Sequence, residues 1–527
     1  MFKFVTNRRI IDISALMISA VIIWFLYFAT NFNGIPIGHS DAMNYGQIAR
    51  NIVKGEGFTV NEIVPRKLLY VSDKSEYFKS IIAPPLHPLV ISLFFFLFGI
   101  SDTTLILSSA LFFILVVPQL YLLTNDLYNR KIALVVSGLY IISLQLLWYT
   151  LSGQTESLYV FLLVAGFYAV YKSKEPWHFL IVGAILGLSW LTRVNTIFFI
   201  IPFGVYAYLS FPEKRLRNIT LLLAGFIIIG SPIFYRNYHY FGDPILGWYG
   251  SAAAWGTEFN QQPLVKTSIG TSVNVIFDQP LRFITKYFSN LTSYYFGFLK
   301  FTKPLIMAFF IVSLFRWSFD ERVNKFKILF LGSFLFQLLI LCAYGESSRI
   351  RYFHIFIPLI IIFATEAFFF VYEKFDIKQG AVKVLIPIVL VSFLAAPLIG
   401  VTAPWKTSKS DNRTNYSWIG RFLKENTNEN EIIMSNTSSA VGWYGDRKAI
   451  NLPASFATVE AINKNYLKID GILLLSSQNE KVRDYLEELS NEWKYIHKKS
   501  PPNYGGYSLV KKFYVGSIKT VLYKNIK

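Results

Sequence analysis

Long apolar stretches separated by short polar segments make up most of the first 400 residues. If about 17 to 25 apolar residues are taken as one membrane span, the pattern predicts eleven spans. They lie near residues 10–29, 103–123, 131–149, 156–171, 178–191, 196–211, 218–233, 303–319, 327–344, 352–371 and 383–400. The pattern therefore predicts an all-α polytopic membrane domain.

One further apolar segment, residues 86–100, is shorter, and it contains Pro88 and Gly99. The distribution of Lys and Arg decides how it is interpreted. If this segment does not cross, the most basic loops all share one side, which the positive-inside rule assigns to the cytoplasm. We therefore predict that 86–100 is an interfacial or re-entrant helix within a long first outer loop, residues 30–102. The N-terminus is then cytoplasmic.

The two ends of the chain differ in character. Residues 1–29 resemble a signal peptide, but the apolar part is too long and lacks a small-residue cleavage site, so a retained first span is expected. Past Pro404 the chain becomes polar. Strand patterns near 431–436, 469–475 and 507–510, with helical patterns near 459–463 and 481–489, predict a small α/β domain. The predicted division is a membrane domain at 1–402 and an extracytoplasmic domain at 403–527.

Composition supports the membrane class and excludes others. The chain is 53% hydrophobic and 16% charged, with a mean hydropathy of +0.41, which is too apolar for a soluble protein. The net charge of +19 comes from basic residues clustered between apolar runs, so we expect membrane orientation and not nucleic-acid binding to explain it. A single cysteine, Cys342, rules out a disulfide framework and a thiolate metal site.

An acidic residue directly follows the first predicted span. Ser40 is a favourable N-cap, and the spacing of Tyr45, Ile48 and Ile52 predicts an amphipathic helix with Asp41 in its first turn. Two interpretations of Asp41 stay open at this point. It is either a helix-terminal carboxylate stabilised by the helix dipole, or a general base whose pKa is raised toward the working range by partial desolvation.

Four arginines lie at the outer ends of separate predicted spans, against the positive-inside rule: Arg193, Arg236, Arg349 and Arg351. A guanidinium group near lipid is costly unless paired, and its planar fork suits a phosphate. Contact with lipid headgroups is the alternative for a lone arginine, and a local ion pair with Glu346 is an alternative for Arg349 or Arg351. We predict that at least two of the four bind an anion.

Other polar residues on the predicted outer side are less specific. Glu156 begins a predicted span, where it is either a dipole-stabilised helix acid or part of a site. His39 and His87 could join Asp41 around a divalent metal, but no ligand pair at helical spacing exists, so no metal site is predicted. The chain has no phosphate-binding Gly-Lys-Ser/Thr loop, dinucleotide fingerprint, His-Glu-x-x-His or Gly-x-Ser-x-Gly motif. ATP-driven transport and hydrolase activity therefore lose support.

Several short motifs, taken in order, resemble those of the GT-C superfamily of polytopic glycosyltransferases. The resemblance is to the branch of protein O-mannosyltransferases and lipid A aminoarabinose transferases. The motifs are Asp41-x-x-x-Tyr45-x-x-x-Ala49 with Gly55-x-Gly57-Phe58, Pro84-Pro85-Leu86, Thr155-Glu156, Leu191-Thr192-Arg193, Arg236-Asn237-Tyr238-x-x-Phe241-Gly242, Arg349-x-Arg351-Tyr352, and Gly442-Trp443-Tyr444-Gly445-x-Arg447. Ala42 stands where the mannosyltransferases have Glu, and Ala83 stands where the aminoarabinose branch has Lys.

The resemblance implies an enzyme of the plasma membrane. Such an enzyme transfers a sugar from a polyprenyl-phosphate carrier to an extracytoplasmic lipid, glycan or protein, with inversion at the anomeric carbon. Asp41 corresponds to the general base of such an enzyme. The motifs also imply which residues contact the substrates. Arg193, Arg236, Arg349 and Arg351 would hold the donor phosphate, and Tyr45, Glu156 and Asn237 would contact substrates. A transporter or flippase for a lipid-linked or anionic substrate is the alternative, but almost no charge lies within the predicted spans, which favours an interfacial enzyme.

Overall fold

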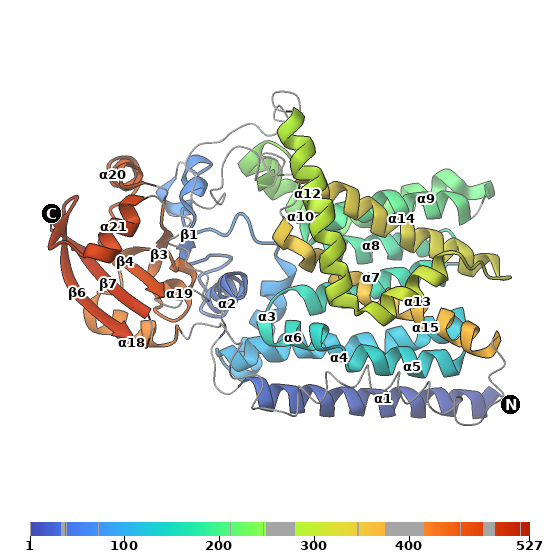
Figure 1. Ribbon diagram of the computed structural model, residues 1–527. Helices are drawn as coiled ribbons and strands as arrows, with labels where there is room; N and C mark the ends of the chain where they lie inside the picture. Colours follow the sequence, from blue (N-terminus) through green and yellow to red (C-terminus); the bar gives the residue numbers. More distant parts are fainter. Residues whose placement is uncertain are drawn as a thin grey trace.

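The computed structural model describes residues 2–32, 37, 39–71, 73–210, 212–245, 247–248, 280–344, 347–374, 416–453, 455–477, 491–516 and 518–526. A helical bundle and a mixed β-sheet with flanking helices make up these residues (Figure 1). The bundle helices are α1 (Phe2–Asn31), α4 (Asp102–Leu127), α5 (Arg130–Ile141), α6 (Leu144–Ser152), α7 (Glu156–Tyr171), α8 (His178–Trp190), α9 (Ile200–Ser210), α10 (Arg215–Phe241), α12 (Pro280–Thr302), α13 (Pro304–Leu314), α14 (Glu321–Tyr344) and α15 (Ile357–Lys374).

The apolar helices coincide with ten of the predicted spans, while the eleventh, 383–400, lies outside the described residues. By length and composition, five of the described helices can each cross a membrane. A sixth span forms if α5 and α6, which are bent by 48° at the break between them, count as one. Helices α3, α7, α8 and α13 and the segment 194–210 are apolar but shorter. The described residues therefore contain fewer full-length spans than the eleven predicted.

Glycines bring α8 and α10 into close contact. A Cβ atom added at Gly183 would collide with the carbonyl of Leu222, and one at Gly225 would collide with the carbonyl of Leu180. Small residues at such crossings let helix backbones approach closely, which is how helices commonly pack in membranes. Helix α10 also continues without a break through Pro232.

No span was predicted between residues 233 and 303, yet helices cover both ends of that stretch. Helix α10 extends to Phe241, and α12 covers Pro280–Thr302. Proline removes only one backbone donor, and neighbouring helices in a membrane protein tolerate it. Helix α12 was not predicted because its pattern is the reverse of that of a soluble helix. Polar Lys286 and Asn290 are buried, while Phe288 and Tyr295 are exposed.

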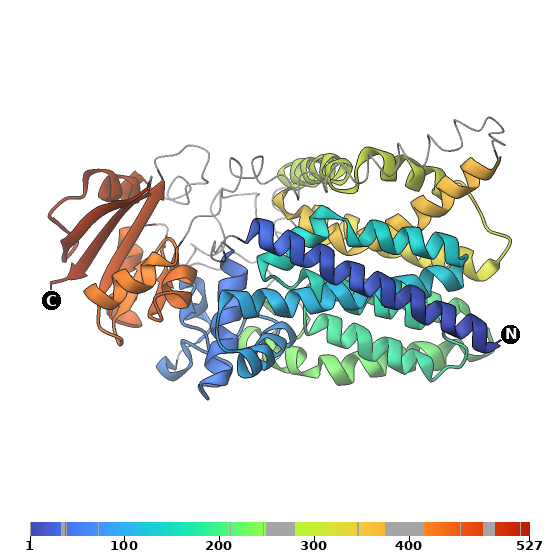
Figure 2. The ribbon, with the colours of Figure 1, turned by 90° about the horizontal axis from the view of Figure 1, so that it is seen from below.

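The first outer loop is built from short elements that gather at one end of the bundle. They are α2 (Ser40–Val53), β1 (Glu62–Ile63), η1 (Pro65–Leu69), η2 (Lys74–Glu76) and α3 (Leu86–Phe98). Figures 1 and 2 place α2 and the sheet at the end of the bundle opposite the chain's N-terminus. Helix α3 matches the predicted helix at 86–100, and at 13 residues it is short for a span.

Helix α2 has the predicted apolar face but a different start. Ile48 is fully buried, and Tyr45 and Ile52 pack around it against Val60. The prediction that Ser40 is the N-cap is wrong, because Ser40 is the first helical residue and His39 occupies the cap position without a side-chain cap bond. Asp41 still lies in the first turn, where a carboxylate is favoured.

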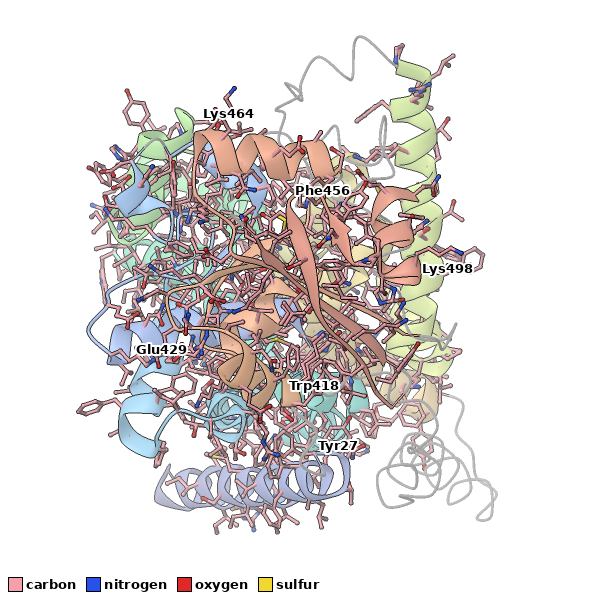
Figure 3. The ribbon with its side chains drawn as sticks, turned by 90° about the vertical axis from the view of Figure 1, so that its left-hand side faces the viewer. Tyr27, Trp418, Glu429, Phe456, Lys464 and Lys498 are labelled. Carbon is pink, nitrogen blue, oxygen red and sulfur yellow. The ribbon has the colours of Figure 1, made fainter. Side chains whose placement is uncertain are left out.

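The sheet has seven strands in the order β1-β3-β2-β4-β7-β6-β5. Strands β1 to β4 pair in parallel, while β4, β7, β6 and β5 pair antiparallel. The strands other than β1 are β2 (Ile432–Ser435), β3 (Lys448–Asn451), β4 (Gly471–Ser477), β5 (Asn503–Tyr504), β6 (Tyr507–Val515) and β7 (Ile518–Asn525). The helices packed around them are α18 (Trp418–Asn426), α19 (Ser438–Trp443), α20 (Phe456–Asn465) and α21 (Asn491–Lys499). Helices α18 and α20 lie on opposite sides of the sheet (Figure 3).

The sheet crosses the predicted boundary between the two domains. Its edge strand β1 comes from the first outer loop and pairs in parallel with β3, with Glu62 opposite Ala449 and Ile63 opposite Ile450. Strand β7 had no counterpart in the sequence analysis, and the helix predicted at 481–489 lies outside the described residues. The segment 403–527 thus supplies six of the seven strands.

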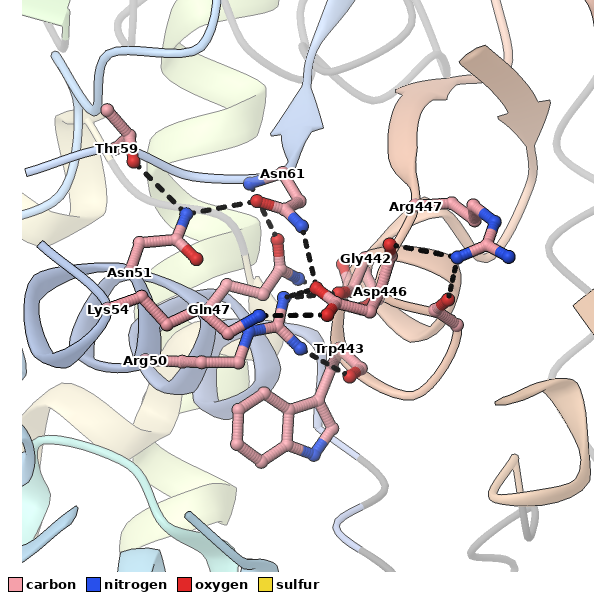
Figure 4. Close-up of polar contacts among 12 residues, drawn as sticks. Gln47, Arg50, Asn51, Lys54, Thr59, Asn61, Gly442, Trp443, Asp446 and Arg447 are labelled. Atoms are coloured by element: carbon pink, nitrogen blue, oxygen red, sulfur yellow. Dashed lines mark hydrogen bonds and ion pairs between the residues drawn. The ribbon is translucent and has the colours of Figure 1, made fainter. Parts of the chain in front are cut away.

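Polar contacts fasten α2 to α19 (Figure 4). Arg50 donates hydrogen bonds to the carbonyls of Gly442 and Trp443 at 2.8 and 2.9 Å, and it forms an ion pair with Asp446 at 2.9 Å. Lys54 makes a second ion pair with Asp446, also at 2.9 Å. We call these contacts the α2–α19 joint. It fixes the helix that carries Asp41 to the sheet.

Candidate functional site

An ion pair between segments far apart in the sequence defines the candidate site. Arg351 Nη2 lies 2.8 Å from Asp41 Oδ2, which links the first turn of α2 to η6 (Ser347–Phe356). Arg351 Nη1 also lies 3.4 Å from Gln154 Oε1. The Asp41 side chain is 45% exposed, so an incoming molecule can reach this carboxylate.

A second ion pair lies beside the first and is deeply buried. Arg193 Nη1 contacts Glu156 Oε1 at 2.8 Å, and the two side chains are 9% and 2% exposed. The ring of Tyr352 connects the two pairs, because the guanidinium of Arg193 lies 4.7 Å from its centroid and that of Arg351 lies 5.8 Å from it. The structure thus brings Asp41, Glu156, Arg193 and Arg351 together in one cluster.

Local backbone geometry explains how α7 presents its residues to this cluster. Gly153 between α6 and α7 has φ of 67°, a left-handed conformation that glycine adopts without strain. A Cβ there would also collide with Leu105. The turn places Gln154 beside Arg351 and lets Glu156 begin α7.

Helix α3 is held against the same turn. His87 Nε2 lies 3.3 Å from the carbonyl oxygen of Gly153, and the His87 ring packs edge-on against Tyr45 with centroids 5.1 Å apart. Tyr45, a predicted substrate residue, thereby lies next to the turn that bears the cluster. His39, the other predicted metal candidate, packs edge-on against Trp148. Among the residues that the structure describes, no three His, Cys, Asp or Glu side chains form a metal-binding group.

Arg236 and Asn237 contact other parts of the chain. Arg236 donates to the carbonyl oxygens of Ala83 at 2.6 Å and Ile82 at 3.4 Å, so its guanidinium holds the segment that leads into α3. Asn237 Nδ2 donates to the carbonyl of Pro244 at 3.3 Å. For Arg349, the structure describes the backbone within η6 but not the side chain.

Two residues of the site region, Gln154 and Glu62, were not singled out from the sequence, and Tyr352 was named within a motif without a role. Gln154 directly precedes the Thr155-Glu156 motif, and that position was the available signal. Glu62 gave no signal, because nothing near it in sequence marks it. It accepts hydrogen bonds from Ser438 Oγ at 2.6 Å and Asn44 Nδ2 at 3.4 Å, and burial raises its pKa.

Comparison with known structures defines the class of fold. The chain is similar to ArnT from Cupriavidus metallidurans bound to undecaprenyl phosphate, with 11% identity, a TM-score of 0.57 and 97% of each chain covered. It is also similar to the oligosaccharyltransferase of Archaeoglobus fulgidus, with 14% identity and a TM-score of 0.60, over 98% of this chain and 74% of that one. Both are GT-C glycosyltransferases, so this protein has the GT-C fold.

A family model narrows the resemblance. Residues 83–235 match the model of the dolichyl-phosphate-mannose-protein mannosyltransferases, from the segment preceding α3 to the end region of α10. No curated protein sequence matches the chain significantly. The resemblance to GT-C glycosyltransferases predicted from the motifs is confirmed by these findings.

Proposed function

We propose that this protein transfers a sugar from a polyprenyl-phosphate carrier to an acceptor on the extracytoplasmic side of the membrane. The contact between Asp41 and Arg351 carries the proposal. It joins a half-exposed carboxylate to an arginine 310 residues away in sequence, at the end of the bundle that bears the sheet. The similar ArnT structure is bound to undecaprenyl phosphate, and an Archaeoglobus oligosaccharyltransferase structure contains a dolichol-phosphate.

In the proposed reaction, Asp41 acts as the general base. Its carboxylate, whose side chain is 45% exposed, accepts the proton of an acceptor hydroxyl as the hydroxyl oxygen attacks the anomeric carbon. The bond between the anomeric carbon and the phosphate oxygen breaks, and its electron pair leaves with the lipid phosphate. A single displacement of this kind inverts the anomeric centre. The acceptor is a lipid, a glycan or a protein that offers a nucleophilic hydroxyl.

Arg351 is the arginine best placed to stabilise the leaving phosphate. Its guanidinium already lies against the base, and its planar fork offers further donors to phosphate oxygens. Arg193 lies one ring away across Tyr352, and Arg349 precedes Arg351 by two residues. We assign the phosphate role to these three. The contacts of Arg236 with the first outer loop favour a different task, which is to hold the entrance of α3 in place.

Purified protein tests the proposal directly. The assay combines radiolabelled polyprenyl-phosphate sugars with a crude envelope fraction and compares the wild type with Asp41→Asn. We expect transfer by the wild type and its loss in the variant. Asp73→Asn, which changes an exposed carboxylate in the same loop, is the matched control and should transfer normally. Undiminished transfer by Asp41→Asn would remove Asp41 from catalysis.

The proposal includes a topology, in which the N-terminus is cytoplasmic and the site lies on the outer side of a plasma membrane. A Ser101→Cys variant reports on this, because Ser101 is exposed at the start of α4. The native Cys342 is buried and serves as the unlabelled background. We expect an impermeant thiol reagent to label Ser101→Cys in intact cells. Labelling only after the membrane is opened would mean that residues 86–100 cross it.

A further inference from the structure

Glu62 is a buried carboxylate at the place where the first outer loop, α2 and α19 meet. Its Oε1 accepts a hydrogen bond from Ser438 Oγ of α19 at 2.6 Å, and its Oε2 accepts one from Asn44 Nδ2 of α2 at 3.4 Å. The residue is 8% exposed. Each oxygen thus contacts a different element, and Glu62 itself belongs to the edge strand β1.

The hydrogen bonds that Glu62 accepts do not by themselves require an acid at this position. Its hydrogen-bond donors Ser438, Ser439 and Asn44 are neutral. Within the described part of the chain, no Lys or Arg forms an ion pair with Glu62. Burying a carboxylate without a cation is costly, and a glutamine of the same shape could make the same contacts. The cost of keeping a charged group here suggests that its charge has a use.

The neighbour that can use this charge is Asp41. Asn44 lies one turn after Asp41, on the same face of α2. The pKa of Glu62 is raised mainly by burial, against the hydrogen bonds from Ser438, Ser439 and Asn44, and the charge of Asp41 raises it further. Interaction between two charges is reciprocal, so a charged Glu62 also strengthens proton binding by Asp41.

We infer that Glu62 is a positioning residue for the reaction proposed at Asp41: it holds the first turns of α2 against α19, and its negative charge keeps Asp41 basic. The inference rests on the proposed function. Arg351 alone would stabilise the ionised form of Asp41 and weaken it as a base. The negative charge of Glu62 opposes this effect of Arg351.

The other charged groups around Asp41 belong to the cluster already described. Arg351 faces Asp41 from η6, and Glu156 and Arg193 lie behind Arg351 and pair with each other. The ion pair between Glu156 and Arg193 contributes no net charge. Arg351 and Glu62 therefore act on Asp41 with charges of opposite sign.

The α2–α19 joint keeps this arrangement in register (Figure 4). Gln47 donates to the carbonyl of Ser439 at 3.0 Å and accepts from the amide of Asn61 at 3.1 Å, which fixes the residue next to Glu62. Arg50 anchors the following turn of α2. Glu62 consequently cannot move away from Asn44 without disturbing several bonds.

The test separates the charge of Glu62 from its packing. Glu62→Gln keeps the shape and can bond to Ser438 and Asn44, but it removes the charge. We expect the acid limb of the kcat/KM profile for sugar transfer to move to lower pH. Glu62→Asp restores the charge and should return the limb toward that of the wild type. Gln47→Met is the matched control, because it weakens the same joint without changing a charge and should lower thermal stability without moving the limb.

An assay that needs no substrate distinguishes this inference from the proposed function. In pH-difference infrared spectra of the purified protein, the Asp41 carboxyl band is assigned by its loss in Asp41→Asn. We expect this band to titrate at lower pH in Glu62→Gln than in the wild type. A wild type without transfer activity would end the proposed function, yet the band would still decide whether the two carboxylates interact.

An unshifted Asp41 band and an unshifted limb in Glu62→Gln would overturn the inference and leave Asp41 as the base. If Glu62→Gln does not fold, Ser438→Ala takes its place. Losing the donor to Oε1 makes Glu62 neutral at higher pH, so the Asp41 band should move in the same direction. A Ser438→Ala band that stays at the wild-type position would overturn the inference as well.

Discussion

Two carboxylate–arginine pairs lie toward opposite ends of the bundle, and their carboxylates differ in exposure to solvent. Toward the N-terminal end, Asp12 of α1 accepts two bonds from Arg130 at 2.6 and 2.8 Å and one from Tyr121 at 2.6 Å. At the end that bears the sheet, Arg351 contacts one oxygen of Asp41 at 2.8 Å. The Asp12 side chain is 7% exposed and that of Asp41 is 45% exposed.

The difference separates a structural pair from the pair that we propose to be reactive. A carboxylate that accepts three strong bonds and is closed to solvent joins α1, α4 and α5, and it has no capacity left for a substrate. A carboxylate that Arg351 orients and whose side chain is 45% exposed is still able to accept a proton from a substrate. The same two residue types therefore serve as a clamp in one place and as a candidate catalyst in the other.

Exchanging each aspartate for asparagine gives the largest contrast. Asp41→Asn should lower sugar transfer by roughly 10²- to 10⁴-fold, since a general base contributes about that much, while the melting temperature changes little. Asp12→Asn should do the reverse, with a clearly lower melting temperature and normal transfer per folded molecule. Radiolabel transfer and thermal unfolding in detergent measure both. Equal loss of activity in the two variants would break the distinction.

Removing one partner of the buried pair should reduce stability most. Glu156→Gln leaves Arg193 buried without its counter-charge, which typically costs about 3–5 kcal/mol. We expect a strong drop in the melting temperature and in the yield of folded protein. The double variant Glu156→Gln with Arg193→Gln should recover part of the loss, because it removes the unpaired charge. No recovery would mean that the two side chains act separately.

Arg351→Gln tests the link between the base and the leaving phosphate. Loss of one donor to a developing anion typically lowers the rate by about 10²-fold or more, so kcat for transfer should fall by about that factor. Arg130→Gln is the matched control at the other pair and should lower stability while kcat stays at the wild-type value. The expectation is wrong if Arg351→Gln raises KM and leaves kcat unchanged.

The smallest expected effect concerns the α2–α19 joint. Burial alone would raise the pKa of Asp446, but the charges of Arg50 and Lys54 outweigh burial and lower it. A lowered pKa in the folded protein means that Asp446 adds stability above the ordinary value near 3.8, and that this stability is lost as the pH falls below it. Because its side chain is 42% exposed, the contribution is at most about 1 kcal/mol.

Melting curves against pH measure that contribution. Asp446→Asn should melt slightly below the wild type at pH 7, and the difference should disappear in acid, where the wild-type carboxylate is protonated. Asp243→Asn, which changes a partly exposed aspartate away from the joint, is the control. A difference that persists in acid would assign the effect of Asp446 to packing and not to its charge.

Local pattern was sufficient for the apolar helices but not for the polar contacts between them. The predicted spans at 156–171 and 178–191 agree within one residue with α7 and α8, since their apolar runs are bounded by polar residues. The pairing of Glu156 with Arg193 was not foreseen, because the two are 37 residues apart. The sequence predicted that both residues lie on the same side of the membrane, but it did not predict which acid pairs with which arginine.

The misses have physical causes of the same kind. Helix α12 buries polar residues and exposes aromatic ones, which hides it from a search for apolar runs. Strand β1 has only two residues and forms because β3 offers an edge, so its own sequence does not specify it. Glu62 matters through Ser438, which is 376 residues away. Contacts of this range depend on the whole fold.

Strand β1 also constrains the order in which the molecule can be assembled during synthesis. The first outer loop emerges early, but its edge strand has no partner until β3 is made hundreds of residues later, and early unpaired edges are prone to wrong association. Bringing such distant segments together is slow. A chain that stops after α15 would contain Arg193, Arg236, Arg349 and Arg351 but would lack the α2–α19 joint that holds the helix bearing Asp41. We therefore expect the proposed site to be fixed in place only once the sheet is complete.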